Sequence, residues 1–464
     1  MYWVYNLILR CGALLAAPWV IGVLPFLPKW RRGFWARLGF YSRDLRESLA
    51  DLPRPRVWFH ASSVGELSAV APIAASLKER HPNLAVVVST MTQNGYRLIE
   101  EKIPAMSQKM LAPLDFPGAV KRALRAVEPD ILVIAETEIW PNLLRQAKRF
   151  GCQLALVNGR MSEKSFRGYA RLGVWLRDVL DRFDVLAMQS EGDAERYLKL
   201  GANAQRVKIT GNAKFDAVSA DISRELSSEL RLSRERPVWV AGSTRPGEEE
   251  IILDAFALVR AEVPDAVLIL APRHLERLGE VEKMLTARRL DFTTRSRVPT
   301  ELLDFPIVLL DTLGELAKIY GLGRVAFVGG SLVPLGGHNP LEPAGLGVPV
   351  LFGPHTEHFT KAAEILLERG AAGVVHNTVD LAAAVVFFLR DPEASRRRGE
   401  AAQQAVASHR GAAGQTATLL QKLMLIKRWG SEVKNWRSET LSGASSKPSG
   451  NPSGMLDDWP EWPL

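Results

Sequence analysis

The chain has 464 residues, of which 47% are hydrophobic and 24% charged, and its formal net charge is +8. This length exceeds one ordinary hydrophobic core and suits two α/β domains, while the composition excludes a wholly disordered chain. The two cysteines, Cys11 and Cys152, lie far apart without a CxxC partner, which excludes a disulfide framework and a cysteine zinc site.

The N-terminal segment is apolar from Cys11 to Pro28 and contains Pro18 and Pro25. About eighteen residues are just enough to span a bilayer, and the prolines make a shallow or tilted insertion equally compatible with the sequence. No small-residue cleavage site follows, so we expect a retained membrane anchor over residues 1–28. A buried core helix over 11–28 is the alternative.

A basic segment follows, because residues 29–56 contain eight Lys or Arg and three Asp or Glu. Positive charge directly after an apolar anchor predicts that the rest of the chain lies on the cytoplasmic face of the inner membrane, beside anionic lipids. The basic residues do not alternate with aromatic residues, so a nucleic-acid partner is not expected.

From residue 57 onward, short apolar runs alternate with segments whose apolar residues have helical spacing. The predicted strands are 57–61, 84–90, 110–115, 130–136, 153–159, 185–190 and 206–212, then 238–243, 266–272, 307–311, 324–330, 348–354 and 371–377. Runs without polar alternation are typical of parallel strands that are covered on both faces.

The predicted fold class is therefore α/β, with two Rossmann-like domains that face each other across a cleft. We expect an N-terminal domain over 29–216, a linker over 217–236 and a C-terminal domain over 237–427, which includes helices after about residue 380. Residues 428–464 are rich in Ser, Gly and Pro and are predicted to be disordered.

Motifs of the first domain place charged residues at strand ends. HASSVGE (60–66) follows a strand and opens a helix, so Glu66 is a candidate general base for a sugar hydroxyl. The alternative for Glu66 is a first-turn residue that the helix dipole favours. AETEIWPN (135–142) puts Glu136 and Glu138 at a second strand end, and only one of them is expected to face the cleft. GNAKFD (211–216) contains Lys214, which either reaches an anionic centre or is a surface lysine.

Three motifs of the second domain lie at strand ends or helix starts, and the last two of them predict a nucleotide site. GSTRPGEEE (242–250) combines a strand end with an acidic helix start, which Ser243 or Thr244 is expected to cap. APRH (271–274) puts the guanidinium of Arg273 at a strand end, where it suits a phosphate. DTLGEL (311–316) puts Gly314 at a helix start with free backbone N–H groups.

The glycine-rich stretch from Gly329 to His355 is predicted to organise this site. Asn339 is expected to cap a helix with Pro340 in its first turn, and Glu342 lies within reach of a ribose diol. The helix start suits an anion, and a glycine-rich loop without a ligand is the alternative. The core contains no Asp-x-Asp pair for a nucleotide-bound divalent ion, so neither a metal nor a cofactor is expected.

Together, HASSVGE, AETEIWPN, GNAKFD, GSTRPGEEE, APRH, DTLGEL and GGHNPLEP resemble the motifs of the 3-deoxy-D-manno-octulosonic acid (Kdo) transferases. The resemblance covers about residues 1–427. It implies a B-type glycosyltransferase fold, and inverting transfer of Kdo from CMP-Kdo to the lipid A precursor at the inner membrane. It also implies that Glu66 is the base and that Glu136 and Lys214 stabilise the transition state. The CMP-binding residues that it implies are Pro272, Arg273, Leu313, Gly314, Glu315, Asn339, Pro340, Leu341 and Glu342.

Two other functions are compatible with the motifs taken singly. A different B-type enzyme, either a transferase or an epimerase, would use a UDP-sugar and would be inhibited or stabilised by UDP instead of CMP. A nonenzymatic nucleotide-binding module at the membrane would not turn over CMP-Kdo.

Overall fold

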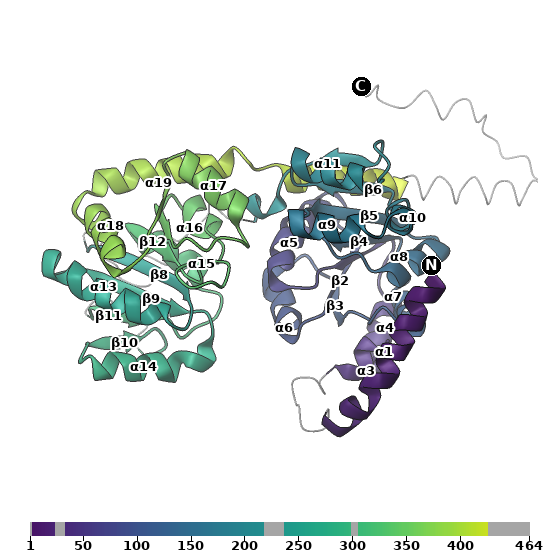
Figure 1. Cartoon of the computed structure of the whole chain (residues 1–464), viewed down its shortest axis with the longest axis horizontal. Coiled ribbons are helices and arrows are strands. Elements are labelled where there is room, and N and C mark those ends of the chain that lie inside the picture. Colours follow the sequence, from purple (N-terminus) through teal and green to yellow (C-terminus); the bar gives the residue numbers. More distant parts are fainter. Residues whose placement is uncertain (1, 24–32, 218–235, 298–304, 426–464) are drawn as a thin grey trace, which may run out of the picture.

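Two α/β domains lie next to each other in the computed structural model, and the chain returns from the second to the first along the upper edge of the view (Figure 1). The structure describes residues 2–23, 33–217, 236–297 and 305–425. Nearly all of the expected linker (217–236), the expected tail (428–464) and part of the expected anchor and basic segment lie outside the described residues.

The first domain has a sheet of seven parallel strands in the order β3-β2-β1-β4-β5-β6-β7. The strands are β1 (Arg56–His60), β2 (Ala85–Thr90), β3 (Gln108–Leu111), β4 (Ile131–Ala135), β5 (Gln153–Gly159), β6 (Val185–Met188) and β7 (Val207–Ile209). Strands β1, β2 and β4 are buried along their whole length, which explains their continuous apolar sequences. The strand order reverses between β1 and β4, and ligands of such sheets bind beyond the carboxyl ends of the strands at this point.

Helices cover both faces of this sheet. They are α4 (Arg43–Ala50), α5 (Val64–Arg80), α6 (Gln93–Lys102), α7 (Pro117–Val127), α8 (Pro141–Arg149), α9 (Glu163–Ala170), α10 (Val174–Leu180) and α11 (Glu191–Lys199), with short α3 (Phe34–Arg37) and the 3-10 turn η2 (Ala213–Phe215). Successive residues of β1 enter opposite cores: Trp58 packs on the α7 side, whereas Val57 and Phe59 pack on the α5 side.

The second domain repeats this plan with the order β10-β11-β9-β8-β12-β13-β14. The strands are β8 (Val238–Thr244), β9 (Val267–Pro272), β10 (Phe292–Thr294), β11 (Ile307–Leu309), β12 (Val325–Val328), β13 (Val350–Phe352) and β14 (Ala372–Val374). Its helices are α13 (Glu248–Glu262), α14 (Leu278–Ala287), α15 (Leu316–Ile319), α16 (Leu341–Gly345), α17 (Thr360–Glu368), α18 (Thr378–Arg390) and α19 (Pro392–Ala407), with η3 (Leu275–Arg277) and η5 (Tyr320–Leu322). Here the strand order reverses between β8 and β12.

The predicted pair of parallel α/β sheets is confirmed, and the first strand begins near residue 57 as expected. Strand β10 was not predicted from the sequence. It has three residues, two of them threonines, and pairs with β11 at the edge of the second sheet. Such a short segment has no apolar run to identify it.

The last described helix, over residues 412–425, belongs by packing to the first domain. Ala413, Ala417, Leu420 and Leu423 are buried in the core on the α5 side of the first sheet. The sequence-based boundary at residue 427 put this helix in the second domain, and its packing contradicts that assignment.

The described chain leaves the first domain near Asp216 and returns to it near Gly411, and these two points are joined. The carboxylate of Asp216 accepts hydrogen bonds from the backbone N–H groups of Gly411 (2.6 Å) and Ala413 (2.9 Å). The rings of Phe215 and His409 stack with their centroids 5.1 Å apart. Asp216 therefore satisfies N–H groups at the start of helix 412–425 from a distant part of the sequence.

Helix α1 (Tyr2–Val23) lies along the first domain (Figure 1) and contacts it through one face. The hydroxyl of Tyr5 donates to Asp115 (2.9 Å), and the side chains of Asn6 and Asn142 form hydrogen bonds with each other. The exposed large apolar residues of α1 are Trp3, Val4, Leu7, Ile8, Leu14 and Leu15. The buried-helix alternative for 11–28 is therefore wrong at Leu14 and Leu15, which are 73% and 82% exposed. Among the described residues, no helix combines the length and apolar character needed to cross a membrane.

Replacing Asp216 by alanine should destabilise the first domain. The substitution removes two charge-assisted hydrogen bonds to helix 412–425, each typically worth about 1.5–3 kcal/mol. We expect a lower urea midpoint and faster proteolysis near residue 411, measured by fluorescence and limited digestion. Asp254→Ala, at an exposed ion pair on α13, is the matched control. Equal stability of the two variants would contradict the role of Asp216.

Candidate active site

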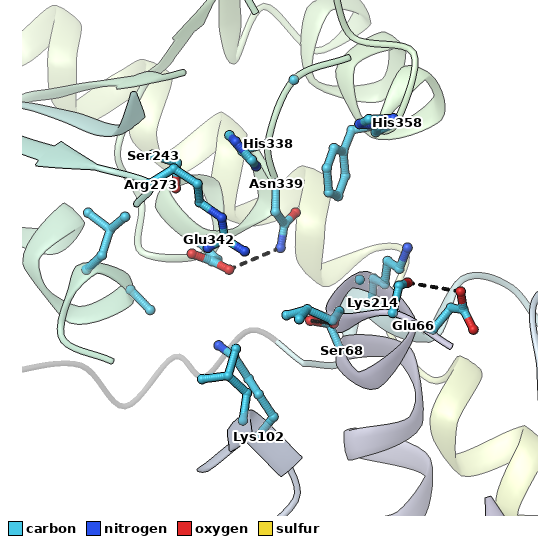
Figure 2. Close-up of a pocket in the computed structure, with 18 of the residues that line it drawn as sticks. Glu66, Ser68, Lys102, Lys214, Ser243, Arg273, His338, Asn339, Glu342 and His358 are labelled. Atoms are coloured by element: carbon cyan, nitrogen blue, oxygen red, sulfur yellow. Dashed lines mark hydrogen bonds between the residues drawn. The ribbon is translucent and has the colours of Figure 1, made fainter. Parts of the chain in front are cut away.

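A pocket of about 510 Å³ lies between the two domains, at the reversal points of both sheets. Figure 2 shows Arg273, His338, Asn339 and Glu342 on the side of the second domain, with Glu66, Ser68, Lys102 and Lys214 opposite them. This volume is in the range of small-molecule sites. The pocket brings together most of the side chains that the sequence motifs placed at strand ends.

Glu66 lies in the first turn of α5, which begins after Ser63. Its carboxylate accepts hydrogen bonds from the backbone N–H of Ser62 (2.7 Å) and the hydroxyl of Ser63 (2.9 Å). Burial raises the pKa of Glu66 to about 7, and the negative charges of Glu138 and Glu136 add to this effect. Glu66 is therefore a first-turn residue that also lines the pocket, and its role as a base stays a prediction. A carboxylate with a pKa near neutrality suits a general base.

Glu136 directly follows β4 with a positive φ of 55° and is only 3% exposed. Its two oxygens pair with different cations, Nε of Arg160 at 2.6 Å and Nζ of Lys214 at 2.7 Å. The group of three carries a net positive charge and lines the pocket. Such a group is suited to stabilise negative charge that develops in a reaction.

Lys214 lies on η2, in the first crossing between the domains, and is 7% exposed, so the surface-lysine alternative is wrong. The side-chain oxygen of Asn158 accepts a hydrogen bond from the backbone N–H of Ala213 (2.9 Å), next to Lys214. The amide of Asn158 also donates to Glu136 (3.4 Å). Asn158 therefore aligns the two partners of this buried ion pair.

Glu138, the other acid of the AETEIWPN motif, accepts a hydrogen bond from the indole N–H of Trp140 (2.6 Å) and does not line the pocket. Of this pair, only Glu136 faces the cleft. Glu138 still acts on the site at a distance, because its charge contributes to the raised pKa of Glu66.

Asn339 and Glu342 form one edge of the pocket in the second domain. The amide of Asn339 donates to Glu342 (3.4 Å, dashed in Figure 2), and its side-chain oxygen accepts from the N–H of Leu341 (3.1 Å). Helix α16 begins at Leu341 with Pro340 at its N-cap, one residue later than expected. The reason is that Asn339 bonds the N–H two residues ahead, as in an Asx turn, and so delays the helix.

The rest of this wall is positively charged. Burial, together with the charges of Arg273 and Arg245, lowers the pKa of His338 to about 3. His338 is therefore neutral near pH 7, and the positive charge of the wall comes from the arginines. A neutral imidazole next to guanidinium groups suits a phosphate oxygen, to which both donate hydrogen bonds.

Four of the expected CMP-binding residues do not line this pocket. Pro272, the last residue of β9, does not line the pocket. Among the described residues, Pro340 lines neither this pocket nor a second pocket next to it. The carboxylate of Glu315 bonds to Arg295 (3.1 Å) and Thr312 instead. Leu341 lines a neighbouring pocket of about 410 Å³, which shares Lys214 and Phe359 with the first. Leu313 and Gly314 line the main pocket as expected.

The expected cap of α13 is wrong. The N-cap is Gly247, with a φ of 91° and no side-chain hydrogen bond. The hydroxyl of Thr244 instead donates to Glu249 (2.9 Å), while Ser243, with a φ of 57°, lines the pocket. A tight turn at Pro246 and Gly247 separates both hydroxyls from the helix start, so neither reaches the first N–H groups.

Several pocket residues were not identified from the sequence. These are Ser68, Lys102, Arg160, Ser243, Tyr320, His358 and Phe359. Arg160 had a usable signal, because it follows β5, the neighbour of β4 in the sheet. Tyr320 lies within the segment 316–322, where the sequence does not separate a pocket wall from a core, and Phe359 is a single apolar residue in a polar segment.

The chain is similar to known proteins in sequence and in fold. The family model for "3-Deoxy-D-manno-octulosonic-acid transferase (kdotransferase)" matches residues 32–217. The chain is 34% identical to the 3-deoxy-D-manno-octulosonic acid transferase of Haemophilus influenzae, over 90% of this chain and 97% of that protein. It is 35% identical to that of Bordetella pertussis, over 90% and 98%.

Among solved structures, the chain resembles a UDP-GlcNAc 2-epimerase from Neisseria meningitidis bound to UDP-GlcNAc, with a TM-score of 0.54 and 14% identity. The match covers 80% of this chain and 99% of the epimerase. At this identity the likeness extends to the fold alone, which is a pair of α/β domains.

Replacing Glu66 by glutamine should stabilise the fold at high pH. The pKa of Glu66 is raised to about 7 in the folded protein, above its pKa in the unfolded chain. The protonated carboxyl therefore contributes stability at a pH below the pKa of the unfolded chain, and this contribution is lost as the pH rises through 7. Glutamine does not ionise, so the stability of the variant does not decrease in this way as the pH rises. The difference in unfolding free energy, variant minus wild type, should therefore grow by on the order of 2 kcal/mol between pH 5 and pH 8. Urea unfolding at both pH values measures this difference, and a constant value would show that the carboxylate is not destabilised by burial.

Proposed function

Because the chain belongs to the family of 3-deoxy-D-manno-octulosonic acid transferases, we propose that it transfers Kdo from CMP-Kdo to the lipid A precursor, lipid IVA, in lipopolysaccharide biosynthesis. One observation carries this proposal. The interdomain pocket combines Glu66, whose pKa is near neutrality, with Arg273 and Glu342 on the facing wall. A base for the acceptor and a phosphate site for the donor therefore open into the same cavity.

The reaction is a single displacement at the ketosidic carbon of Kdo. Glu66 takes the proton from the acceptor hydroxyl, and the acceptor oxygen forms a bond to that carbon. The bond from the carbon to the phosphate oxygen of CMP breaks, and CMP leaves as a phosphate monoester with one additional negative charge. The configuration inverts because the acceptor oxygen attacks from the face opposite the leaving group. Glu66 later releases its proton to water.

The positive groups of the pocket meet the charge that develops in this reaction. Lys214, held next to Glu136 at 2.7 Å, contributes from the first domain, and Arg273 contributes from the second. Electrostatic stabilisation by such prearranged groups is usually a large part of enzymatic rate enhancement. Glu342 accepts hydrogen bonds from the ribose hydroxyls, and the turn at Leu313 and Gly314 lies beside the nucleotide.

The proposal also places the protein at the cytoplasmic face of the inner membrane, where the lipid acceptor is found. The exposed apolar face of α1 supports this placement, since its opposite face is attached to the first domain through Tyr5 and Asn6. A helix held in this way lies in the plane of the lipid headgroups, with Ile8, Leu14 and Leu15 in the acyl region.

The direct test is to incubate the purified full-length protein with CMP-Kdo and lipid IVA and to determine the masses of the lipid products. The expected product is lipid IVA with added Kdo, formed in the presence of EDTA as well as in its absence. A melting temperature raised by UDP but not by CMP, with no product, would instead favour an enzyme that uses a UDP-sugar.

The variant Glu66→Gln should lose transfer by about 10²- to 10⁴-fold, as is typical when a general base is removed, while its KM for CMP-Kdo changes little. In the wild type, kcat/KM should fall as the pH drops below about 7, where Glu66 becomes protonated. Initial rates from pH 5.5 to 9 measure both effects. Glu79→Gln, at an exposed position of the same helix, is the control. Transfer near the wild-type rate in Glu66→Gln would remove this residue from the mechanism.

Membrane binding should depend on the exposed apolar face of α1. Burial of a leucine side chain is worth about 1.5–3 kcal/mol, so Leu14→Ser with Leu15→Ser should weaken binding to anionic phospholipid vesicles at least tenfold. Cosedimentation measures the binding. The control is Val379→Ser, at a similarly exposed position on α18. Unchanged cosedimentation of the double variant would show that α1 does not contact the membrane.

A further inference from the structure

Glu248, the first residue of α13, is a buried carboxylate that the proposed reaction does not use. It accepts four hydrogen bonds, all from backbone N–H groups. One oxygen receives those of Ser331 (3.0 Å) and Leu332 (2.9 Å), and the other receives those of Gly330 (2.6 Å) and Arg245 (2.9 Å). Successive backbone N–H groups that converge in this way form a concave anion site. The anion in this site belongs to the protein itself.

The first two glycines of this loop lie in close contact with Glu248 and His338. A Cβ atom at Gly329 would lie 2.9 Å from an oxygen of Glu248 and 2.6 Å from the carbonyl oxygen of Ser243. Gly330 has a φ of 72°, and a Cβ there would lie 2.9 Å from the ring of His338. Gly329 therefore allows the close approach of the Glu248 carboxylate, and Gly330 allows the close approach of the His338 ring.

The loop held by Glu248 leads directly to the pocket. The carbonyl oxygen of Gly330 accepts from the N–H of Gly337 (2.7 Å), and that of Gly329 accepts from the N–H of His338 (3.1 Å). Gly337, His338 and Asn339 all line the pocket. Only one layer of backbone hydrogen bonds thus separates the residues that Glu248 holds from those that face the ligand.

We infer that Glu248 is a positioning residue of the nucleotide site. By holding the N–H groups of 330–332, it holds the backbone of 337–339 in the position that receives the donor phosphate. The identity of the ligand, CMP-Kdo, rests on the proposed function, whereas the control of the loop by Glu248 does not.

The negative charge of Glu248 is essential to this role. A glutamine at this position has one oxygen and one NH₂ group, so two of the four backbone N–H groups would face a donor instead of an acceptor. Buried N–H groups without an acceptor are costly, so the loop moves until they find one. Residues 337–339 then move with it.

The neighbouring residue Glu249 provides a matched control. It is equally buried and lies in the same helical turn. Its partners are Arg277 (2.8 Å) and the hydroxyl of Thr244 (2.9 Å), and neither belongs to the loop 329–339. A purely structural role for Glu248 predicts that Glu248→Gln and Glu249→Gln behave alike.

The test compares these two variants in the full-length protein. Both should have lower melting temperatures than the wild type. Only Glu248→Gln should raise the KM for CMP-Kdo, by about tenfold to a hundredfold, which corresponds to one lost charge-assisted hydrogen bond. The KM for lipid IVA should change less than about threefold in both variants. An equal rise in the donor KM in the two variants, or no rise in Glu248→Gln, would overturn the inference.

Hydrogen exchange provides a second measurement that needs no substrate. In the ligand-free protein, the amides of residues 329–339 should exchange faster in Glu248→Gln and at the wild-type rate in Glu249→Gln. If the wild type does not turn over CMP-Kdo, the proposed function fails, and the exchange rates still decide the role of Glu248. If Glu248→Gln does not fold, Glu248→Asp, which keeps the charge but shortens the side chain, takes its place in both measurements. Unchanged exchange in the folded variant would also overturn the inference.

Discussion

The arrangement of the cleft depends on one buried ion pair, between Lys214 and Glu136. Lys214 lies on the crossing between the domains, and Glu136 stands where the strand order of the first sheet reverses. The pair is 2.7 Å long and nearly inaccessible to water. Removing Glu136 would leave the buried charge of Lys214 without its partner, at a cost of about 3–5 kcal/mol, whereas removing Lys214 would leave Glu136 paired with Arg160 alone. The ammonium group of Lys214 also lies 5.7 Å from the centre of the Phe359 ring in the second domain. Lys214 thus contacts pocket residues of both domains.

The parts of the fold that follow from local pattern were predictable from the sequence. Strands such as β1 and β4 are apolar throughout because helices cover both faces of the sheet, and this pattern is visible without a structure. The packing of helix 412–425 was not predictable. Its apolar positions require a buried surface, but they do not specify whether the first or the second domain provides it. Strand β10 was missed for a different reason, since three residues at a sheet edge form no recognisable period.

The residues of the site also divide into those that the sequence identified and those that it did not. Glu66, Glu136 and Arg273 were found because charged residues at the ends of buried strands converge at the reversal point of a parallel sheet. Arg160 and Asn158 were missed because their importance lies in contacts with Glu136, across two strands. The glycine-rich stretch was predicted to organise the site, and the structure divides it: Gly329 lies against Glu248, whereas Gly337, His338 and Asn339 line the pocket. A sequence motif identifies a tight loop, and only the structure identifies what the loop encloses.

The packing of residues 412–425 makes the second domain an insertion within the first. The core that begins with β1 is completed only by Leu420 and Leu423, after the whole second domain has been passed. During synthesis, the second domain leaves the ribosome as a continuous segment and can fold while the first still lacks its final helix. The domain that carries α1 and Glu66 therefore reaches its final packing last, when the domain that carries Arg273 and Glu342 is already formed.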